Sequence, residues 1–453
     1  MCNIGEYIYD PDRLIFYKSC LTEDIIEKIR SAVEINDQYD EQKTMLDNLD
    51  ADNMTIKERP IDQIGICLTY NCQLRCNYCS YSSTEDNCDL LDSNDIIAFV
   101  VDVIKKRTIH SMVIKKDIDT PLRFFFTGGG EPTYNWKLFK EVVVGIIDKC
   151  KQYCVPYYLE LTTNGLLNNL QRKFITDNFN KVMLSYDGMP DTQNKNRRTA
   201  KHINTSKIVE DSISFFGDSG LSLTIRSTVW HTDFGRMREM CDYLGNRFDK
   251  FDEWSIMPIL PSGRALDYKH TKQYDSENYD FFNSYIDLIN YAKQKFSNLY
   301  ISAPVFNNTI STFCCGATFV QCYWIMPDKS IINCIEAERF KVTIGNINNG
   351  KVEYLDAYHD SHLDVVRKSF TECRNCLAYR FCKGGCPLKY IRDKQFGTEY
   401  KKYECSMITQ YWEYTFNKIL SGEQCFGWCV KPINNEDIAQ YNVLQLSRIE
   451  EEK

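Results

Sequence analysis

The chain lacks a concentrated basic tract. Its 54 lysines and arginines are outnumbered by 62 aspartates and glutamates, which gives a formal net charge of −8. Because proteins bind nucleic acid through clustered positive side chains that contact phosphates, nucleic acid is not an expected partner. The mild acidity otherwise indicates only that the protein is soluble.

Long hydrophobic runs are also absent from the 453 residues. No apolar run is long enough to span a bilayer, and the sequence does not open on an apolar signal segment. We therefore expect no membrane partner and a cytoplasmic location. The sequence has no internal repeat and no low-complexity stretch. Its length exceeds that of a usual single domain, so two or three domains are expected.

Cysteine, in contrast, is abundant, with 21 residues. Cysteine clusters in the cytoplasm more often bind metals or act in catalysis than form disulfides. The first cluster is CQLRCNYC, in which Cys72, Cys76 and Cys79 follow the apolar run 64–68. Three thiolates on one loop can bind three irons of a 4Fe-4S cluster and leave the fourth iron open, whereas iron-sulfur sites usually use four cysteines. The open iron would accept a small chelating molecule.

Buried thiols or a zinc site are the alternatives for this triplet. Zinc motifs combine CxxC pairs with further Cys or His ligands, and no such partner lies nearby in the sequence. A Gly-rich turn, TGGGEPT, follows a second apolar run at 123–126. Together the two motifs resemble those of the radical S-adenosylmethionine (radical SAM) superfamily, because motif and context agree.

Short β-rich runs alternate with helical patterns from residue 61 to about 265. One helical pattern is 93–106, in which Ser93 can cap the helix. Six successive β-α units predict an α/β fold with a parallel sheet. The radical SAM resemblance implies a partial (β/α)6 TIM-like barrel with its active site at the carboxyl ends of the strands. The predicted strands are 63–69, 122–127, 157–162, 181–186, 221–229 and 253–259.

Composition and resemblance divide the chain into four regions. The first, 1–60, contains YIYDPDRLIFY, which predicts a hairpin around 10–12, and an amphipathic helix pattern at 22–35. It is either a shortened recognition element that binds a leader peptide as an added strand or a cap that packs on the barrel. The other regions are the partial barrel (61–306), which ends with a helix at about 276–296, a cysteine-rich domain (307–410) and a C-terminal helical tail (411–453).

The resemblance implies that the amino group and carboxylate of S-adenosylmethionine chelate the open iron and that one electron releases a 5′-deoxyadenosyl radical, while the protein orients the cofactor. Glycines let the backbone approach the ligand, and Glu131 or neighbouring carbonyls accept from the ammonium group. Ser185 resembles the ribose contact, Arg226 the carboxylate ligand and Tyr78 the residue beside the adenine. The implied cofactor-binding residues are Tyr78, Gly128, Gly129, Gly130, Glu131, Pro132, Asn164, Ser185 and Arg226.

Two of these assignments have an alternative: Ser185 and Arg226 can instead cap strand ends or pair with an acidic residue. The run QNKNRR, at 193–198, resembles a loop common in peptide-modifying members of the superfamily. Its role stays open.

The second cysteine cluster has the spacing CxxCx5CxxxC at 373–386 and resembles the SPASM domain of radical SAM maturases. The resemblance implies two fully ligated auxiliary 4Fe-4S clusters, hence three clusters with the triplet. A pair of zinc sites is the alternative. The implied ligands are Cys315, Cys322, Cys334 and Cys386 for the first auxiliary cluster, and Cys373, Cys376, Cys382 and Cys405 for the second.

Two positions depart from the SPASM pattern. The family has a glycine in a turn five residues before the third ligand, where this chain has Lys329, and Asp328 can support the turn instead. Cys314 adjoins Cys315, so either one can be the ligand. If neither binds, the first auxiliary cluster has an open iron that could hold a substrate thiolate.

Proteins that resemble this combination mostly modify ribosomally made peptides or proteins. The implied activity is that of an oxidoreductase-type peptide maturase, which installs an intramolecular thioether crosslink in a precursor peptide with a leader. Carbon-carbon crosslinking of the cyclophane or streptide type and epimerisation are the alternatives. Sulfatase maturation competes with them, but there an acidic base directly follows the third ligand of the first auxiliary cluster, whereas Ile335 follows Cys334 here.

The same resemblance implies an electron donor such as flavodoxin or ferredoxin, and exposed clusters would favour an anaerobic setting. Near the end of the sequence, Cys425 and Cys429 either handle substrate or are unreactive buried thiols. The alternative from a different class is a non-catalytic zinc-binding or electron-transfer protein.

Overall fold

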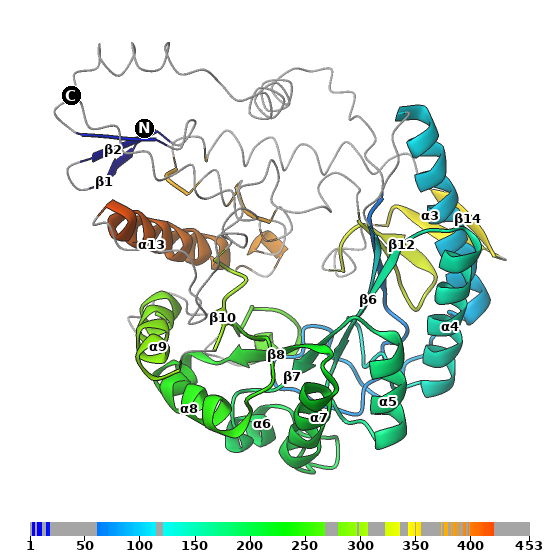
Figure 1. Cartoon of the computed structure of the whole chain (residues 1–453), viewed down its shortest axis with the longest axis horizontal. Coiled ribbons are helices and arrows are strands. Elements are labelled where there is room, and N and C mark those ends of the chain that lie inside the picture. Colours follow the sequence, from blue (N-terminus) through cyan, green and yellow to red (C-terminus); the bar gives the residue numbers. More distant parts are fainter. Residues whose placement is uncertain are drawn as a thin grey trace.

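A curved sheet with helices on its convex side dominates the computed structural model of the chain (Figure 1). The structure describes three short strands near the start of the chain, then residues 61–114, 121–267, 280–296, 299–306, 322–335, 343–348 and 350–354. It further describes individual positions between 373 and 399 and the helix at 400–420. No helix among these residues is long and apolar enough to cross a membrane.

The parallel part of the sheet confirms the predicted α/β alternation. Neighbouring strands follow the order of the sequence from β4 to β9, and every pair among them is parallel. The six strands are β4 (Gln63–Ile66), β5 (Leu122–Phe126), β6 (Tyr157–Thr163), β7 (Lys181–Ser185), β8 (Ser222–Val229) and β9 (Glu253–Pro258). Each lies within three residues of its predicted bounds.

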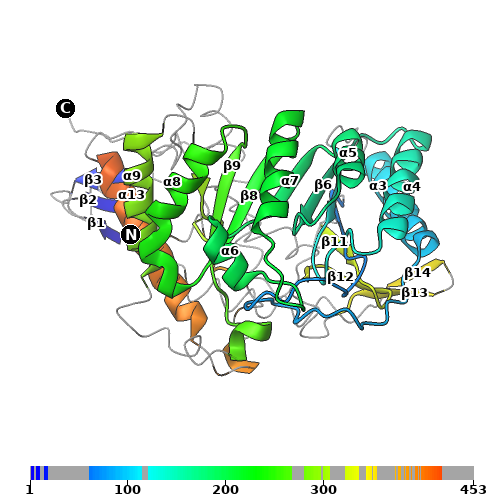
Figure 2. The ribbon, with the colours of Figure 1, turned by 90° about the horizontal axis from the view of Figure 1, so that it is seen from below.

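The helices between these strands cover the outer face of the sheet in both ribbon views (Figure 2). Their apolar sides pack on alternate strand residues, such as Phe124, Leu161 and Ile225, which are fully buried. The helices are α3 (Ser93–Ile114), α4 (Trp136–Gln152), α5 (Asn169–Asn178), α6 (Pro190–Asn196), α7 (Ser206–Ser219), α8 (Met237–Arg247) and α9 (Phe281–Lys295), with the 3-10 turns η1 (His231–Arg236) and η2 (Gly263–Asp267).

The predicted cap of α3 is wrong by one residue. Asp92 caps the helix, because its Oδ1 accepts from the main-chain N–H of Asp95 at 2.9 Å, the third residue of the helix. A carboxylate at this position also faces the positive end of the helix dipole. The helix continues past Lys106 to Ile114, since no Gly or Pro interrupts the run.

The sheet does not end with the barrel. β10 (Ile301–Ser302) pairs with β9, and β11 (Cys322–Ile325) adds to the opposite edge in parallel with β4. Beyond β11 follow the antiparallel strands β12 (Ser330–Ile332), β13 (Gly345–Asn348) and β14 (Lys351–Tyr354). The 11-stranded sheet therefore runs from the barrel into the cysteine-rich region without a break.

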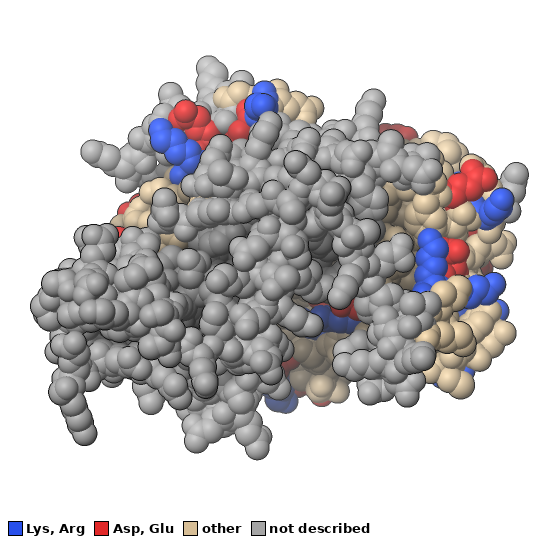
Figure 3. Space-filling view, turned by 90° about the horizontal axis from the view of Figure 1, so that it is seen from above, with Lys and Arg blue, Asp and Glu red and all other residues tan. Residues whose placement is uncertain are grey.

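The predicted N-terminal hairpin is confirmed: β2 (Tyr7–Asp10) pairs antiparallel with β3 (Ile15–Lys18), and β1 (Cys2–Ile4) pairs with β2. This small sheet lies beside the long helix α13 (Tyr400–Leu420). The predicted helix at 22–35, with Cys314, Cys315, Cys425 and Cys429, lies outside the described residues. On the face drawn in Figure 3, the described lysine, arginine and carboxylate side chains lie interspersed.

Candidate active site

The triplet loop, residues 72–79, is held by main-chain hydrogen bonds at both ends. The N–H of Cys72 donates to the carbonyl of Thr84 at 2.7 Å, and the N–H of Arg264 donates to the carbonyl of Cys79 at 3.0 Å. The Arg264 guanidinium donates to the carbonyl of Cys76 at 2.8 Å. These contacts fix the loop beyond the end of β4, at the carboxyl edge of the parallel strands, where α/β sheets place their active sites.

The three thiols of the loop lie close enough to influence one another. Burial raises the pKa of Cys72, and negative charge on Cys76, Glu131 or Cys79 would raise it further. Burial raises the pKa of Cys76 to about 12, although the nearby Arg197 charge opposes the shift. Thiols whose pKa is raised in this way become thiolates only beside a strong positive charge, which bound iron would supply. The donor set therefore fits an iron-sulfur cluster with three protein ligands.

Among the described residues, no three His, Cys, Asp or Glu side chains converge as they would around a single metal ion. In a cubane cluster, each thiolate ligates a different iron, so its ligands need not converge on one point.

The Gly-rich turn packs directly on the segment that leads into the triplet loop. The N–H of Gly130 donates to the carbonyl of Thr69 at 2.8 Å, and the N–H of Glu131 donates to the carbonyl of Asn71 at 2.9 Å. A Cβ on Gly130 would lie 2.0 Å from the Asn71 carbonyl oxygen. Gly128 and Gly129 have positive φ angles of 83° and 62°, which favour glycine. Glycine is thus needed here for close approach of the two backbones.

Replacing Gly130 with alanine is expected to lower the free energy of unfolding by about 1–3 kcal/mol, because the new methyl group would push the Asn71 backbone away. Gly235→Ala is the matched control: its Cβ would meet nothing within 4 Å, and a change within about 0.5 kcal/mol is expected. Urea unfolding followed by circular dichroism measures both. Equal losses in the two variants would contradict the close approach at Gly130.

Glu131 is buried and holds the end of β6 in place. Its Oε1 accepts from the hydroxyls of Thr133 and Thr163, each at 2.7 Å, and its Oε2 accepts from the N–H of Asn164 at 2.8 Å. Burial raises the pKa of Glu131 in spite of these bonds. The Asn164 amide lies 3.9 Å from the Cys72 sulfur. Glu131 thus joins the Gly-rich turn to the end of β6.

Ser185 and Arg226 are neighbours on adjacent strands. They are register partners where β7 ends beside β8, and the Arg226 guanidinium contacts the sulfur of Met183 at 3.4 Å. Arg226 alternates along β8 with Leu223, Ile225 and other residues of the helix-facing core, so it lies on the inner face of the barrel. The structure therefore brings these two predicted residues together at the carboxyl edge, with Pro132 buried beside Glu131.

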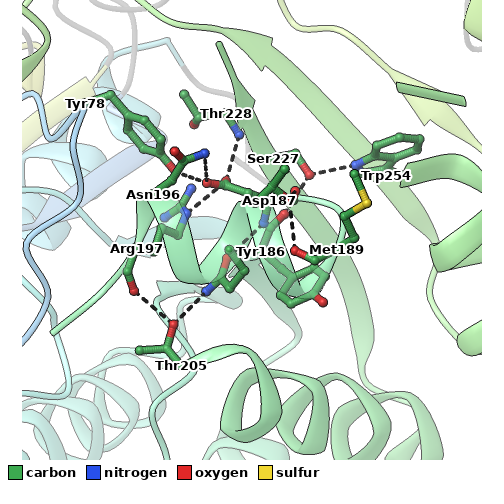
Figure 4. Close-up of polar contacts among 12 residues, drawn as sticks. Tyr78, Tyr186, Asp187, Met189, Asn196, Arg197, Thr205, Ser227, Thr228 and Trp254 are labelled. Carbon is green, nitrogen blue, oxygen red and sulfur yellow. Dashed lines mark hydrogen bonds and ion pairs between the residues drawn. The ribbon is translucent and has the colours of Figure 1, made fainter. Parts of the chain in front are cut away.

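Tyr78 enters a buried polar network that sequence reasoning missed (Figure 4). Its hydroxyl donates to Asp187, which follows β7, and Asp187 forms an ion pair with Arg197 at 3.0 Å. Asp187 also accepts from the amide of Asn196 at 3.3 Å and from the N–H of Thr228 at 3.2 Å. Burial lowers the pKa of Arg197, but the Asp187 carboxylate outweighs it and raises that pKa above its ordinary value.

The network assigns a position to the QNKNRR run. The N–H of Asn77 donates to the carbonyl of Asn196 at 3.0 Å, and the N–H of Arg75 donates to the carbonyl of Arg198 at 2.8 Å. The Arg197 guanidinium also lies 5.2 Å from the centre of the Tyr78 ring. The run thus braces the triplet loop from outside. Two features of the sequence could have indicated this network: the Asp-Gly pair after β7 and the two adjacent arginines at the end of QNKNRR.

Four cysteines of the second predicted auxiliary set lie together. Burial raises the pKa of Cys382 to about 12, and Cys405, Cys376 and Cys373 each contribute to the increase. The pKa of Cys405 rises to about 11 by burial, with Cys373 and Cys376 contributing again, while the buried Lys401 opposes the increase.

The first auxiliary set has two described members on one hairpin. β11 and β12 pair Trp324 with Ile332 and Ile325 with Ile331, so Cys322 begins one arm of the hairpin and Cys334 follows the other. Lys329, in the turn between the strands, has a φ of 68° and so adopts the left-handed conformation that glycine provides in the SPASM pattern. Asp328 supports the turn as expected, since its Oδ1 accepts from the N–H of Ser330 at 3.0 Å.

Ile335, the residue after Cys334, packs on the Gly-rich turn. A Cβ on Gly128 would lie 1.7 Å from the Ile335 Cδ1. The Tyr81 hydroxyl donates to the carbonyl of Ile335 at 2.9 Å, which holds this segment beside the triplet loop. An apolar side chain therefore stands next to the turn predicted to bind the cofactor.

No protein-family model matches the chain. The cysteine-type anaerobic sulfatase-maturating enzyme of Clostridium perfringens (strain ATCC 13124) is 24% identical over 369 residues, which cover 77% of this chain and 95% of that protein. The corresponding enzyme of Clostridium novyi (strain NT) is 22% identical over 336 residues, covering 70% and 85%. The chain is thus similar in sequence to anaerobic sulfatase-maturating enzymes.

Two solved structures are similar to the chain in fold. Native anSMEcpe with bound AdoMet and Cp18Cys peptide has a TM-score of 0.59 at 20% identity and covers 80% of this chain and 98% of its own. Streptococcus suis SuiB bound to precursor peptide SuiA has a TM-score of 0.55 at 17% identity and covers 83% and 86%. The chain shares the fold of these two structures.

Proposed function

We propose that the chain is a radical SAM enzyme that modifies a ribosomally made precursor peptide by an intramolecular crosslink, most simply a thioether. Cys72, Cys76 and Cys79 would ligate a 4Fe-4S cluster that binds S-adenosylmethionine. When bound, the pair would supply a 5′-deoxyadenosyl radical. Two similar solved structures support the proposal, since one contains AdoMet with the Cp18Cys peptide and the other contains the precursor peptide SuiA.

The residues of this chain would do the orienting. The Gly-rich turn would present main-chain carbonyls to the cofactor ammonium group, with Glu131 fixing the turn against Asn164. Arg226, on the inner face of the barrel, would bind the cofactor carboxylate through its planar set of donors. Ser185, its register partner, would contact the ribose. Tyr78 would fix the triplet loop through Asp187 while its ring lies near the adenine.

The observation that favours crosslinking over sulfatase maturation is Ile335 beside Gly128. By resemblance, sulfatase maturases carry an acidic base directly after the third ligand of the first auxiliary cluster. A carboxylate there can accept a proton, whereas the isoleucine side chain cannot. We therefore assign to this chain a reaction that does not use a base at that position. Two auxiliary clusters on the eight SPASM cysteines would remove the second electron that a crosslink releases.

The test is the mass change of a precursor peptide. The reduced enzyme, reconstituted anaerobically, is incubated with a cysteine-containing peptide encoded beside it, and the product is treated with a thiol-alkylating reagent before mass spectrometry. A thioether removes two hydrogens and one alkylatable thiol. Loss of two hydrogens with every thiol still alkylated would mean a carbon-carbon crosslink, and a gain of one deuterium in heavy water would mean epimerisation. Conversion of a cysteine thiol to an aldehyde would indicate sulfatase-type maturation and refute the proposal.

A further inference from the structure

A basic hollow lies against the outer side of the triplet loop. Its volume is about 350 Å³, and its lining includes Arg75, Asn77, Arg198, His202 and Arg264. Three of the lining residues are arginines and none is an aspartate or glutamate. The formal charge of the whole chain is −8, so the positive lining runs against the charge of the molecule.

The contacts of two of these arginines leave their charge available. Arg264 donates to the main-chain carbonyls of Cys76 and Ser83, and Arg75 donates to the carbonyl of Cys72 at 2.6 Å. Carbonyls fix a guanidinium without cancelling its charge. Arg75 also reaches Glu85 at 3.3 Å, but the Glu85 side chain is 42% exposed, and water weakens such a pair. The hollow therefore presents a net positive surface.

The hollow is built on the loop that carries the three cysteines, yet it is separate from the predicted cofactor contacts. Arg75 and Arg264 bond to carbonyls of the cysteines themselves. None of the Gly-rich turn, Asn164, Ser185 or Arg226 lines it. A molecule that occupies the hollow would thus lie next to the cluster without meeting the cofactor. Among the reactants that the proposed function requires, only the source of the electron needs such a position.

We propose that this hollow is the docking site of an acidic one-electron donor protein, of the kind represented by reduced flavodoxin. This inference rests on the proposed function. One electron would leave the donor and enter the cluster on Cys72, Cys76 and Cys79, so the donor is oxidised and the cluster reduced without a bond being made or broken. Long-range attraction between the arginines and donor carboxylates would orient the donor against the negative charge of the rest of the chain.

The test uses the reconstituted full chain with the charge reversal Arg198→Glu, because Arg198 lines the hollow and lies outside the triplet loop. Lys137→Glu, on α4 and 88% exposed, is the matched control with the same change in net charge. Flavodoxin affinity is measured by biolayer interferometry, and reduction of the clusters by flavodoxin is followed by stopped-flow absorbance. Arg198→Glu should weaken binding and slow reduction by about tenfold at low salt, with a smaller difference at high salt.

Iron content and the absorbance of the clusters after full reduction with dithionite are measured for each variant. Wild-type values in Arg198→Glu show that the cluster itself is intact. Flavodoxin affinity unchanged by Arg198→Glu, or equally weakened by Lys137→Glu, would overturn the inference while leaving the proposed function in place. Weakened binding of the precursor peptide with unchanged flavodoxin binding would make the hollow a substrate surface and overturn it as well. A wild-type chain that takes up no iron would refute the proposed function itself.

Discussion

Replacing Cys76 with alanine is expected to abolish 5′-deoxyadenosine release, with a loss of at least about a thousandfold, and to lower the iron content from about twelve to about eight per chain. Cys76 is the central ligand of the proposed triplet and lies beside Cys79 and Arg197. Two remaining thiols cannot hold a cubane that already has one open iron. The auxiliary sets do not include Cys76, so their iron should remain bound.

Cys150→Ala provides the control. Cys150 is a fully buried thiol on α4 whose pKa is raised to about 12 by burial, as it is for Cys76, but it belongs to no predicted site. Its replacement should leave iron, sulfide and cofactor cleavage unchanged. Iron and sulfide are measured after anaerobic reconstitution, and deoxyadenosine by liquid chromatography. Continued cleavage in Cys76→Ala would contradict the triplet assignment, and stoichiometric zinc without iron would favour the non-catalytic alternative.

Replacing Arg197 with alanine is expected to lower the free energy of unfolding by about 3 kcal/mol, because it leaves the buried Asp187 carboxylate without its ion-pair partner. The loss should fall at the lower end of the range for broken buried pairs. Tyr78, Asn196 and the N–H of Thr228 would still donate to Asp187. Since the same network fixes the triplet loop, the variant should also retain less iron.

The matched comparison is Arg238→Ala. Arg238 pairs with Asp287, but both side chains are 52% exposed, so water already screens the pair and a change within about 1 kcal/mol is expected. Urea unfolding under anaerobic conditions compares the two variants. The double variant Asp187→Asn with Arg197→Ala should recover part of the loss, since no buried charge is then left alone. An equal decrease in the free energy of unfolding for Arg197→Ala and Arg238→Ala would show that the buried ion pair stabilises the fold no more than the exposed pair does.

The sequence predicted the elements whose signal is local. Strands such as β5 and β8 are short runs of β-branched or aromatic residues, and all six were found within three residues of their bounds. The three thiols of the triplet were expected to act together because they share one loop. The cap of α3 was misplaced by one residue because Asp92 and Ser93 are both good caps, and only geometry decides between them.

The missed features depend on contacts between distant segments. Tyr78 and Asp187 are 109 residues apart in sequence, and nothing near either one indicates the other. The partners of Glu131 were also hidden in the sequence: its oxygens accept from Thr163 and Asn164 at the end of the next strand, which only the folded sheet brings near. The role of QNKNRR could not be predicted for the same reason. The sequence shows the positive charge of this run but not that the run contacts the triplet loop.

The pairing of β11 with β4 has a mechanical consequence. Cys322 lies at one end of β11, and the N–H of Cys67, just after β4, donates to the carbonyl of Ile325 at the other end. A chain cut after residue 306 would leave β4 as an open edge, with unpaired main-chain groups beside the loop that begins at Cys72. The cysteine-rich segment thus stabilises the strand that precedes the triplet loop. This effect does not depend on what the cysteines of the segment bind.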